Sequence, residues 1–391
     1  MPTKMLIVDD ETDLELLIRQ KFRKQIRENE FDFVFAHNGH EALAQIDQHP
    51  DIGLVLSDIN MPEMDGLTLL LKIAELEKPA MKAIVVSAYG DMENIRTAMN
   101  RGAFDFVTKP IDFSDLEVTI NKTIQHVESI KKAHKEHEQL TAVQQDLSVA
   151  ARIQQSLLPN KFPAFPDRKE IDLYAMMVTA KEVGGDFYDF FFLDNDRLAI
   201  VVGDVSGKGV PAAIFMALSR TVLKTIAGRI EDPGECLRQV NELLIPESDS
   251  AMFVTIFYAV LNTRTGALTF SNGGHNPPYL VSASGDVSAF EYVGGPIVGK
   301  IPGLTFDSKT ITMSPGDSIF MFTDGVTEAM NPARNLFDEE RLIECLKRDK
   351  DKQLTELLQC IYSDIKTFAS TEPQSDDITM LSMRYIGNGV S

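Results

Sequence analysis

Residues 5–13 read MLIVDDETD, an apolar run that ends in two adjacent aspartates. A short buried strand explains the apolar run, but neighbouring carboxylates repel one another and folding does not need them there. Residues 373–380, PQSDDITM, again set two aspartates against an apolar run. A charged strand end is the ordinary interpretation of each pair. The alternative is that the chain carries two sites, each of which holds divalent cations near a phosphoryl group.

The composition narrows the class of protein. A chain of 391 residues suggests two or three domains, and its net charge of −20 argues against non-specific binding to nucleic acid. The three cysteines form no CxxC pair, so neither a disulfide framework nor a thiolate zinc site is indicated. No signal peptide is evident and no window approaches 18 uninterrupted apolar residues. We therefore expect a cytoplasmic protein with no nucleic-acid or membrane partner.

The first 110 residues alternate short apolar runs with longer amphipathic segments. Regular alternation of strands and helices predicts a parallel sheet that is covered on both faces, with function at the carboxyl ends of the strands. The expected strands are residues 4–8, 32–36, 52–57, 82–87 and 104–108, and the expected helices lie near 12–27, 39–48, 66–76 and 90–101.

Residues 113–158 contain no glycine and no proline, which predicts a long helix. An apolar stripe in alternating steps of three and four is formed by Leu140, Val143, Leu147, Ala150, Gln154 and Leu157. Such spacing fits either a single linking helix that packs on its neighbours or a parallel dimeric coiled coil. The pattern favours the coiled coil, and hence a homodimer formed through this helix.

Residues 171–386 form a second globular unit of a different kind. Strand-like runs cluster with occasional helices near 209–228, 233–244, 338–347 and 352–369. This pattern predicts an α+β fold with layered, mainly antiparallel sheets flanked by helices. The expected strands include residues 171–178, 187–193, 198–205, 251–261, 267–273 and 318–325.

Acidic and polar residues follow the expected strands of the first unit. Asp9 and Asp10 end the first strand, Asp58 the third, Ser87 the fourth and Lys109 the fifth. In a parallel sheet these ends meet at one edge, so three carboxylates would need a cation or would raise one another's pKa. A hard, oxygen-ligated ion such as Mg²⁺ suits them, and a lysine suits a phosphoryl oxygen.

The pieces VDDE, SDINMPEMDG, SA and FDFVTKP resemble the receiver domain of two-component response regulators, a flavodoxin-like fold. The resemblance implies that Asp58 accepts a phosphoryl group from a histidine kinase or phosphotransfer protein. It implies a Mg²⁺ site formed by Asp9, Asp10, Asp58 and Asn60. Ser87 and Lys109 would contact the phosphoryl group and Phe106 would be the aromatic switch, although Phe106 also fits a plain core position.

Four acidic stretches mark the second unit: EVGGDFYD, VVGDVSGKG, FTDGVTEA and QSDDITM. Glycine beside three of the aspartates allows the tight loops that a metal site needs. The ligands would all be oxygen, which favours Mg²⁺ or Mn²⁺, and four or five carboxylates exceed the needs of one ion. A pair of ions that activates a water and clamps a phosphate would use them.

These stretches, together with AARIQQSLLP and NGGHNPP, resemble the PPM-type serine/threonine phosphatases of the stage II sporulation and stress-response branch. The resemblance implies that Asp204 bridges two Mn²⁺ or Mg²⁺ ions, with the Val205 carbonyl assisting. Asp186, Asp324 and Asp376 would complete the catalytic metal site. Asp377, the second residue of the Asp-Asp pair, would hold the metal ligands in place without contacting the metal directly.

Together the resemblances imply a response regulator whose phosphorylation controls a phosphatase, with a phosphorylated anti-sigma-factor antagonist as substrate. The expected divisions are a receiver domain at 1–125, a helical coiled-coil linker at 126–160 and a phosphatase domain at 161–391. The alternative is a non-catalytic adaptor that binds a sigma factor or its regulator through a phosphatase-like domain. Such adaptors usually lack several acidic ligands, whereas every expected ligand is present here.

Overall fold

The computed structural model describes residues 2–247 and 252–387. The chain divides into two compact units. The boundary along the chain falls between Val143 and Gln144, within a single helix. Each unit is described by itself below.

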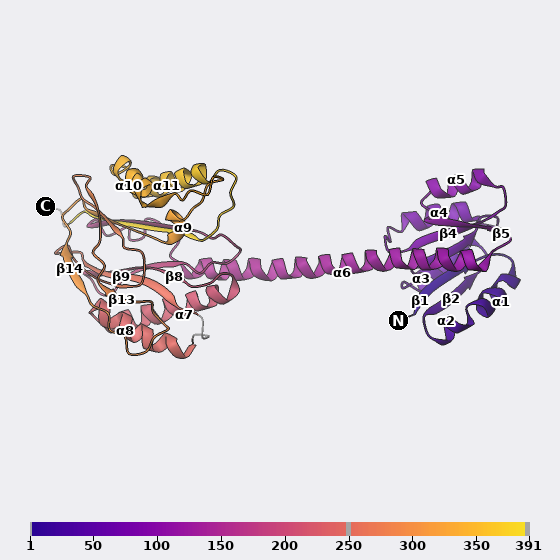
Figure 1. The fold of residues 1–391 in the computed structure, drawn as a ribbon, viewed down its shortest axis with the longest axis horizontal. Helices are drawn as coiled ribbons and strands as arrows, with labels where there is room; N and C mark the ends of the chain where they lie inside the picture. Colours follow the sequence, from indigo (N-terminus) through magenta and orange to yellow (C-terminus); the bar gives the residue numbers. More distant parts are fainter. Residues whose placement is uncertain (1, 248–251, 388–391) are drawn as a thin grey trace. The chain divides into compact units, whose positions relative to one another are not determined.

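The first unit is built on a five-stranded sheet in the order β2-β1-β3-β4-β5 (Figure 1). All neighbouring strands are parallel, as predicted, and the order is that of flavodoxin-like folds. The strands are β1 Thr3–Val8, β2 Phe31–Ala36, β3 Leu54–Asp58, β4 Lys82–Ala88 and β5 Asp105–Lys109.

Helices cover both faces of this sheet because successive side chains of each strand point to opposite sides. Leu6 and Val8 of β1 join one hydrophobic cluster, whereas Met5 and Ile7 join another on the opposite face. The helices are α1 Thr12–Lys21, α2 Arg23–Arg27, α3 Gly39–Gln48, α4 Gly66–Glu75, α5 Met92–Asn100 and the start of α6 Phe113–Leu157. The segment expected to be one helix over 12–27 is two, because the backbone leaves helical geometry at the buried Phe22.

The long helix α6 is confirmed, and the environment of its apolar stripe changes along its length. Leu140 and Val143 are 63% and 56% exposed. Farther along, Ala150, Gln154 and Leu157 line an apolar groove of about 250 Å³ together with the start of α7. The last part of the stripe is therefore engaged within the second unit.

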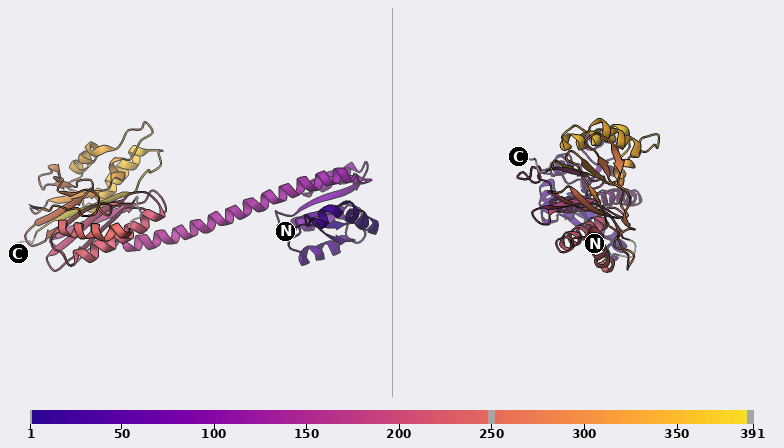
Figure 2. Two further views of the ribbon diagram at one scale, coloured as in Figure 1. Left: turned by 60° about the horizontal axis from the view of Figure 1, so that its bottom comes forward. Right: turned by 90° about the vertical axis from the view of Figure 1, so that its left-hand side faces the viewer.

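The second unit contains two sheets of mainly antiparallel strands, as predicted (Figures 1 and 2). The first sheet has the order β13-β10-β9-β8-β7, with β14 on β10: β7 Phe187–Phe192, β8 Arg197–Val205, β9 Val254–Asn262, β10 Ala267–Gly273, β13 Gly294–Gly295 and β14 Lys309–Thr312. The second has the order β12-β11-β15-β16-β6: β6 Ile171–Val178, β11 Tyr279–Val281, β12 Val287–Ala289, β15 Ser318–Phe322 and β16 Ile378–Tyr385. Ala251, where the fourth predicted strand begins, lies outside the described residues.

Helices flank the two sheets on their outer sides. One pair, α7 and α8, packs on the first sheet, and α11 packs on the second beside α10 (Figure 2). The helices are α7 Val210–Ala227, α8 Pro233–Leu244, the 3₁₀ turn Ile245–Glu247, α9 Asp324–Thr327, α10 Asp338–Arg348 and α11 Leu354–Ala369. Ile319 and Met321 of β15 face one hydrophobic cluster, and Phe320 and Phe322 face the other.

Within the described residues, α7 alone is long and apolar enough to cross a membrane by length and composition. Its inner residues pack into the core of the second unit, where Phe215, Met216 and Leu223 are at most 3% exposed. A helix that covers a sheet has the same composition, so the length and hydropathy of α7 are explained by this packing.

Candidate functional site

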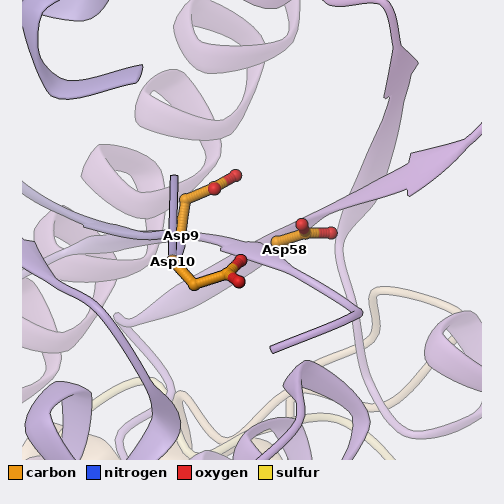
Figure 3. Close-up of side chains that lie close together, drawn as sticks. All are labelled: Asp9, Asp10 and Asp58. Atoms are coloured by element: carbon orange, nitrogen blue, oxygen red, sulfur yellow. The ribbon is translucent and has the colours of Figure 1, made fainter. Parts of the chain in front are cut away.

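Three carboxylates meet at the carboxyl edge of the first sheet (Figure 3). Asp9 and Asp10 follow β1, and Asp58 ends β3, its neighbour in the sheet. One oxygen from each lies within 4.8 Å of the other two. Asp9 and Asp58 are each 5% exposed, while Asp10 is open to solvent. The strand ends thus bring together the trio expected from the sequence.

Lys109, at the end of β5, joins this trio. Its Nζ atom lies 2.7 Å from Asp58 Oδ2 and 3.2 Å from Asp9 Oδ2. Burial alone would lower the pKa of Lys109, but the hydrogen bond to Asp58 and the nearby carboxylates outweigh it and raise that pKa. Burial raises the pKa of Asp9, against the effects of the Glu11 amide and Lys109. The lysine is therefore charged and is held directly against Asp58.

Three other expected residues surround the same edge. The backbone N–H of Asn60 donates to Asp58 Oδ1 at 3.3 Å. Ser87 is fully buried, and its Oγ has no hydrogen-bond partner among the residues that the structure describes. Phe106 is 37% exposed, so its ring is not a plain core side chain here. A glycine is required at position 66, because a Cβ there would lie 2.1 Å from the Asp58 carbonyl oxygen.

The donor set at this edge fits a magnesium ion. All three clustered ligand atoms are carboxylate oxygens, which hard divalent cations prefer. The unpartnered hydroxyl of Ser87 and the ammonium of Lys109 provide donors for a phosphoryl group at Asp58.

The aspartates expected in the second unit lie at strand ends of both sheets. Asp186 immediately precedes β7 and Asp204 lies near the end of β8, in the first sheet. Asp324 begins the short helix α9 after β15, and Asp376 lies two residues before β16, in the second sheet. The two layers therefore supply these aspartates from opposite sides.

These carboxylates influence one another strongly. Burial and the nearby Asp324 carboxylate raise the pKa of Asp204 to about 7. Burial, followed by Asp204 and Asp377, raises the pKa of Asp186 well above its usual value. Burial and Asp376 raise the pKa of Asp324. A set of carboxylates this mutually repulsive requires cations if all are to be ionised near neutral pH.

Asp377 uses both of its carboxylate oxygens to hold backbone. Its Oδ1 accepts from the Ala180 N–H and its Oδ2 from the Gly185 N–H, each at 2.8 Å. A Cβ on Gly184 would lie 2.2 Å from Asp377 Oδ2, and one on Gly185 would lie 2.9 Å from the Val205 carbonyl oxygen. The glycines thus let the loop before Asp186 approach Asp377 and Val205.

Two other polar residues near the site have structural partners. Lys208 Nζ lies 2.8 Å from Asp376 Oδ2. The ring of His275 lies 2.9 Å from Thr255 Oγ1 and 3.0 Å from the Phe322 carbonyl oxygen, and burial lowers its pKa to about 4. His275 is therefore neutral at pH 7 and links the two sheets beside Asp204.

The oxygen-only donor set and the raised pKa values fit hard divalent cations. Among the described residues, only the Asp9, Asp10 and Asp58 trio brings three ligand atoms within 4.8 Å of one another. The aspartates of the second unit therefore do not form a cluster of this kind in the structure.

Sequence reasoning missed two residues that position this site. Thr323 donates to Asp186 Oδ2 at 2.6 Å, and its place directly before Asp324 was the available signal. Gln154 is buried; it donates to the Gly184 carbonyl at 2.6 Å and accepts from the Gly184 N–H at 3.0 Å. The sequence offered one indication of this role, because Gln154 is a polar residue within an apolar stripe. The heptad interpretation placed that stripe against a partner helix.

Comparisons with known proteins agree with this division. Residues 5–121 match the model of the response regulator receiver domain. Residues 194–386 match the model of Stage II sporulation protein E (SpoIIE).

Individual proteins are also similar to this chain in sequence. The chain is 32% identical over 265 residues to protein IcfG of Synechocystis sp., covering 61% of this chain and 41% of IcfG. It is 27% identical over 256 residues to phosphoserine phosphatase RsbU of Bacillus subtilis, covering 64% of this chain and 75% of RsbU. The chain thus spans less than half the length of IcfG.

The SiaA-PP2C domain of Pseudomonas aeruginosa is similar in structure, with a TM-score of 0.55 and 21% identity over 63% of this chain and 98% of that domain. That likeness supports the layered PP2C fold of the second unit. The chain therefore contains a segment similar to response regulator receiver domains, residues 5–121, followed by a segment similar to Stage II sporulation protein E, residues 194–386.

Proposed function

We propose that phosphorylation of Asp58 controls a metal-dependent phosphoserine and phosphothreonine protein phosphatase in the second unit. The observation that carries the proposal is the set of four aspartates, Asp186, Asp204, Asp324 and Asp376, at the strand ends of both sheets. Three of these have a raised pKa. Folding alone gives no reason to keep such a set of repelling carboxylates, of which Asp186 is buried and the other three are half-buried.

In the receiver domain, the Asp58 carboxylate attacks the phosphorus of a phosphohistidine on a histidine kinase or phosphotransfer protein. An oxygen–phosphorus bond forms and the nitrogen–phosphorus bond breaks. Asp9, Asp10, Asp58 and the Asn60 carbonyl would hold Mg²⁺, which neutralises charge on the transferring group. Lys109 moves its contact from Asp58 Oδ2 to a phosphoryl oxygen, and Ser87 donates to another.

In the second unit, Asp186, Asp204, Asp324, Asp376 and the Val205 carbonyl would hold two Mn²⁺ or Mg²⁺ ions. When bound, the ions supply an activated water and stabilise charge on the phosphate during in-line hydrolysis. The chain's own residues fix the geometry. Thr323 orients Asp186 through its 2.6 Å hydrogen bond, and Asp377 fixes the preceding loop.

Regulation is proposed to act through α6. Its exposed stripe, including Leu140 and Val143, would pair with the same helix of a second chain, so that the protein works as a homodimer. The end of the same helix contacts the loop before Asp186, called the catalytic loop below, through the hydrogen bonds between Gln154 and Gly184. A change in helix pairing would therefore reach Asp186 without an intervening flexible segment.

The proposed substrate is a phosphorylated anti-sigma-factor antagonist, and the proposed location is the cytoplasm. Support for the reaction comes from the similarity to RsbU, a phosphoserine phosphatase. The proposed domain limits are 1–125 for the receiver, 126–160 for the linker and 161–391 for the phosphatase.

The test is hydrolysis of p-nitrophenyl phosphate by the purified chain with Mn²⁺, beside Asp204→Ala. Each protein is measured with and without acetyl phosphate or beryllium fluoride, and Asp58→Ala serves as the control for the phosphodonor. Metal-dependent turnover that Asp204→Ala abolishes supports the phosphatase, and a phosphodonor effect that Asp58→Ala abolishes supports the control. No turnover under any condition would refute the activity and favour the adaptor.

A further inference from the structure

Lys300 is exposed and follows the segment that bridges to the start of β9. The Lys300 ammonium lies 5.1 Å from the centre of the Phe253 ring, a cation–π contact. Lys300 forms no ion pair with any of the described residues, and the chain carries a net charge of −20.

The backbone that carries Lys300 is fixed from within the core. Asn241 on α8 is fully buried, and its Oδ1 accepts from the Gly299 N–H at 2.8 Å. The same side chain donates through Nδ2 to the Ile301 carbonyl at 2.9 Å. One buried amide thus holds the residues on both sides of Lys300, which is unusual support for a solvated surface lysine.

The sheet register places the segment before Lys300 near β8, the strand that carries Asp204. Val205 pairs with Val254, and Val254 forms a bridge to Val298, two residues before Lys300. Two strand spacings put the backbones of Val205 and Val298 roughly 10 Å apart. Phe253 is tied to the residue after Val205, because its N–H donates to Ser206 Oγ and its carbonyl accepts from the Ser206 N–H, each at 2.9 Å.

We propose that Phe253 and Lys300 form a rim contact that recognises an acidic segment of the phosphoprotein substrate. The proposal rests on the phosphatase function proposed above and adds a substrate preference to it. Lys300 would contact a carboxylate a few residues from the phosphorylated residue, while the aryl ring of Phe253 supports the peptide backbone between them.

The test uses two synthetic phosphoserine peptides, which carry either Glu or Gln at the second to fourth positions on both sides of the phosphoserine. The full chain, with Mn²⁺, is assayed on both peptides and on p-nitrophenyl phosphate. Lys300→Met keeps the apolar stem and removes the charge, and Lys300→Arg keeps the charge. Lys347→Met, an exposed lysine on α10, is the matched control.

We expect Lys300→Met to raise KM for the Glu peptide roughly three- to fivefold, as for an exposed ion pair, with little change in kcat. Lys300→Arg and Lys347→Met should leave that KM within about twofold, and the difference should shrink at high salt. Turnover of the Gln peptide and of the aryl phosphate should not change.

Equal losses on all three substrates would overturn the proposal, because they would place Lys300 at the phosphoryl group instead. Wild-type protein that does not prefer the Glu peptide, or that hydrolyses only the aryl phosphate, would overturn it as well. In each of these cases the wild type still hydrolyses the aryl phosphate, so its metal-dependent phosphatase activity would stand. Loss of that hydrolysis in the wild type would instead refute the phosphatase.

Discussion

Replacing Gln154 by Met should uncouple the end of α6 from the catalytic loop. Methionine has a similar length but cannot donate to the Gly184 carbonyl or accept from the Gly184 N–H, which are paired at 2.6 and 3.0 Å. Gly184 is buried, so both backbone groups would lose their partner away from water. Each such group costs about 1–3 kcal/mol, so we expect a total loss of at least about 2 kcal/mol in the free energy of unfolding.

Calorimetry of the full chain measures this loss. For a unit of this size the loss corresponds to a fall in Tm of about 5–10 °C. The transition that belongs to the second unit is identified as the one whose shift to higher temperature with Mn²⁺ is reduced in Asp204→Ala, because the first unit has a candidate cation site of its own. The control is Gln155→Met, because Gln155 is the next residue on the same helix but is exposed. Equal melting temperatures for the two variants would refute the reasoning.

Three further predictions concern single positions. Asp58→Asn should prevent the mass gain of about 80 Da that acetyl phosphate gives the wild type by intact mass spectrometry, because the amide is not a nucleophile. Gly184→Ala should lower the free energy of unfolding, measured with a chemical denaturant, by about 1–3 kcal/mol and reduce turnover, because its Cβ would lie 2.2 Å from Asp377 Oδ2. Gly228→Ala is the control and should change neither quantity, because no atom lies nearer than 3.8 Å to its Cβ. In chelator-treated protein the pKa of Asp204 is raised to about 7, so between pH 4 and 7 the folded state binds a proton that the unfolded state does not. The free energy of unfolding should therefore fall as the pH rises from 4 to 7. Asp204→Asn should flatten this pH dependence in pH-jump unfolding experiments.

The sequence predicted the first unit well because strand ends in a parallel sheet share one edge. The positions of Asp9, Asp58 and Lys109 follow from that rule alone, and the structure brings these side chains together. The break at Phe22 was not predictable from periodicity, because it depends on the packing of the ring against Phe31 and Phe33 from the next strand.

The second site was harder to predict, because its residues come from two sheets. Local sequence patterns do not indicate how those two sheets pack on each other. Motifs identified Asp204 and Asp324, but not the hydrogen bond of Thr323 or the clamp on Gly184. Gln154 shows why: helical spacing gives the face on which a side chain lies, but not which neighbour covers that face. The backbone groups that it pairs with are 30 residues away in the chain.

Every hydrophobic cluster formed by the described residues lies wholly on one side of the division between Val143 and Gln144. Each unit is therefore encoded by one uninterrupted stretch of messenger. During translation the last cluster residue of the first unit, Ile124, leaves the ribosome while most of the second unit is still unmade. The first unit can complete its core without waiting for any later residue, so it can fold before the second unit has left the ribosome.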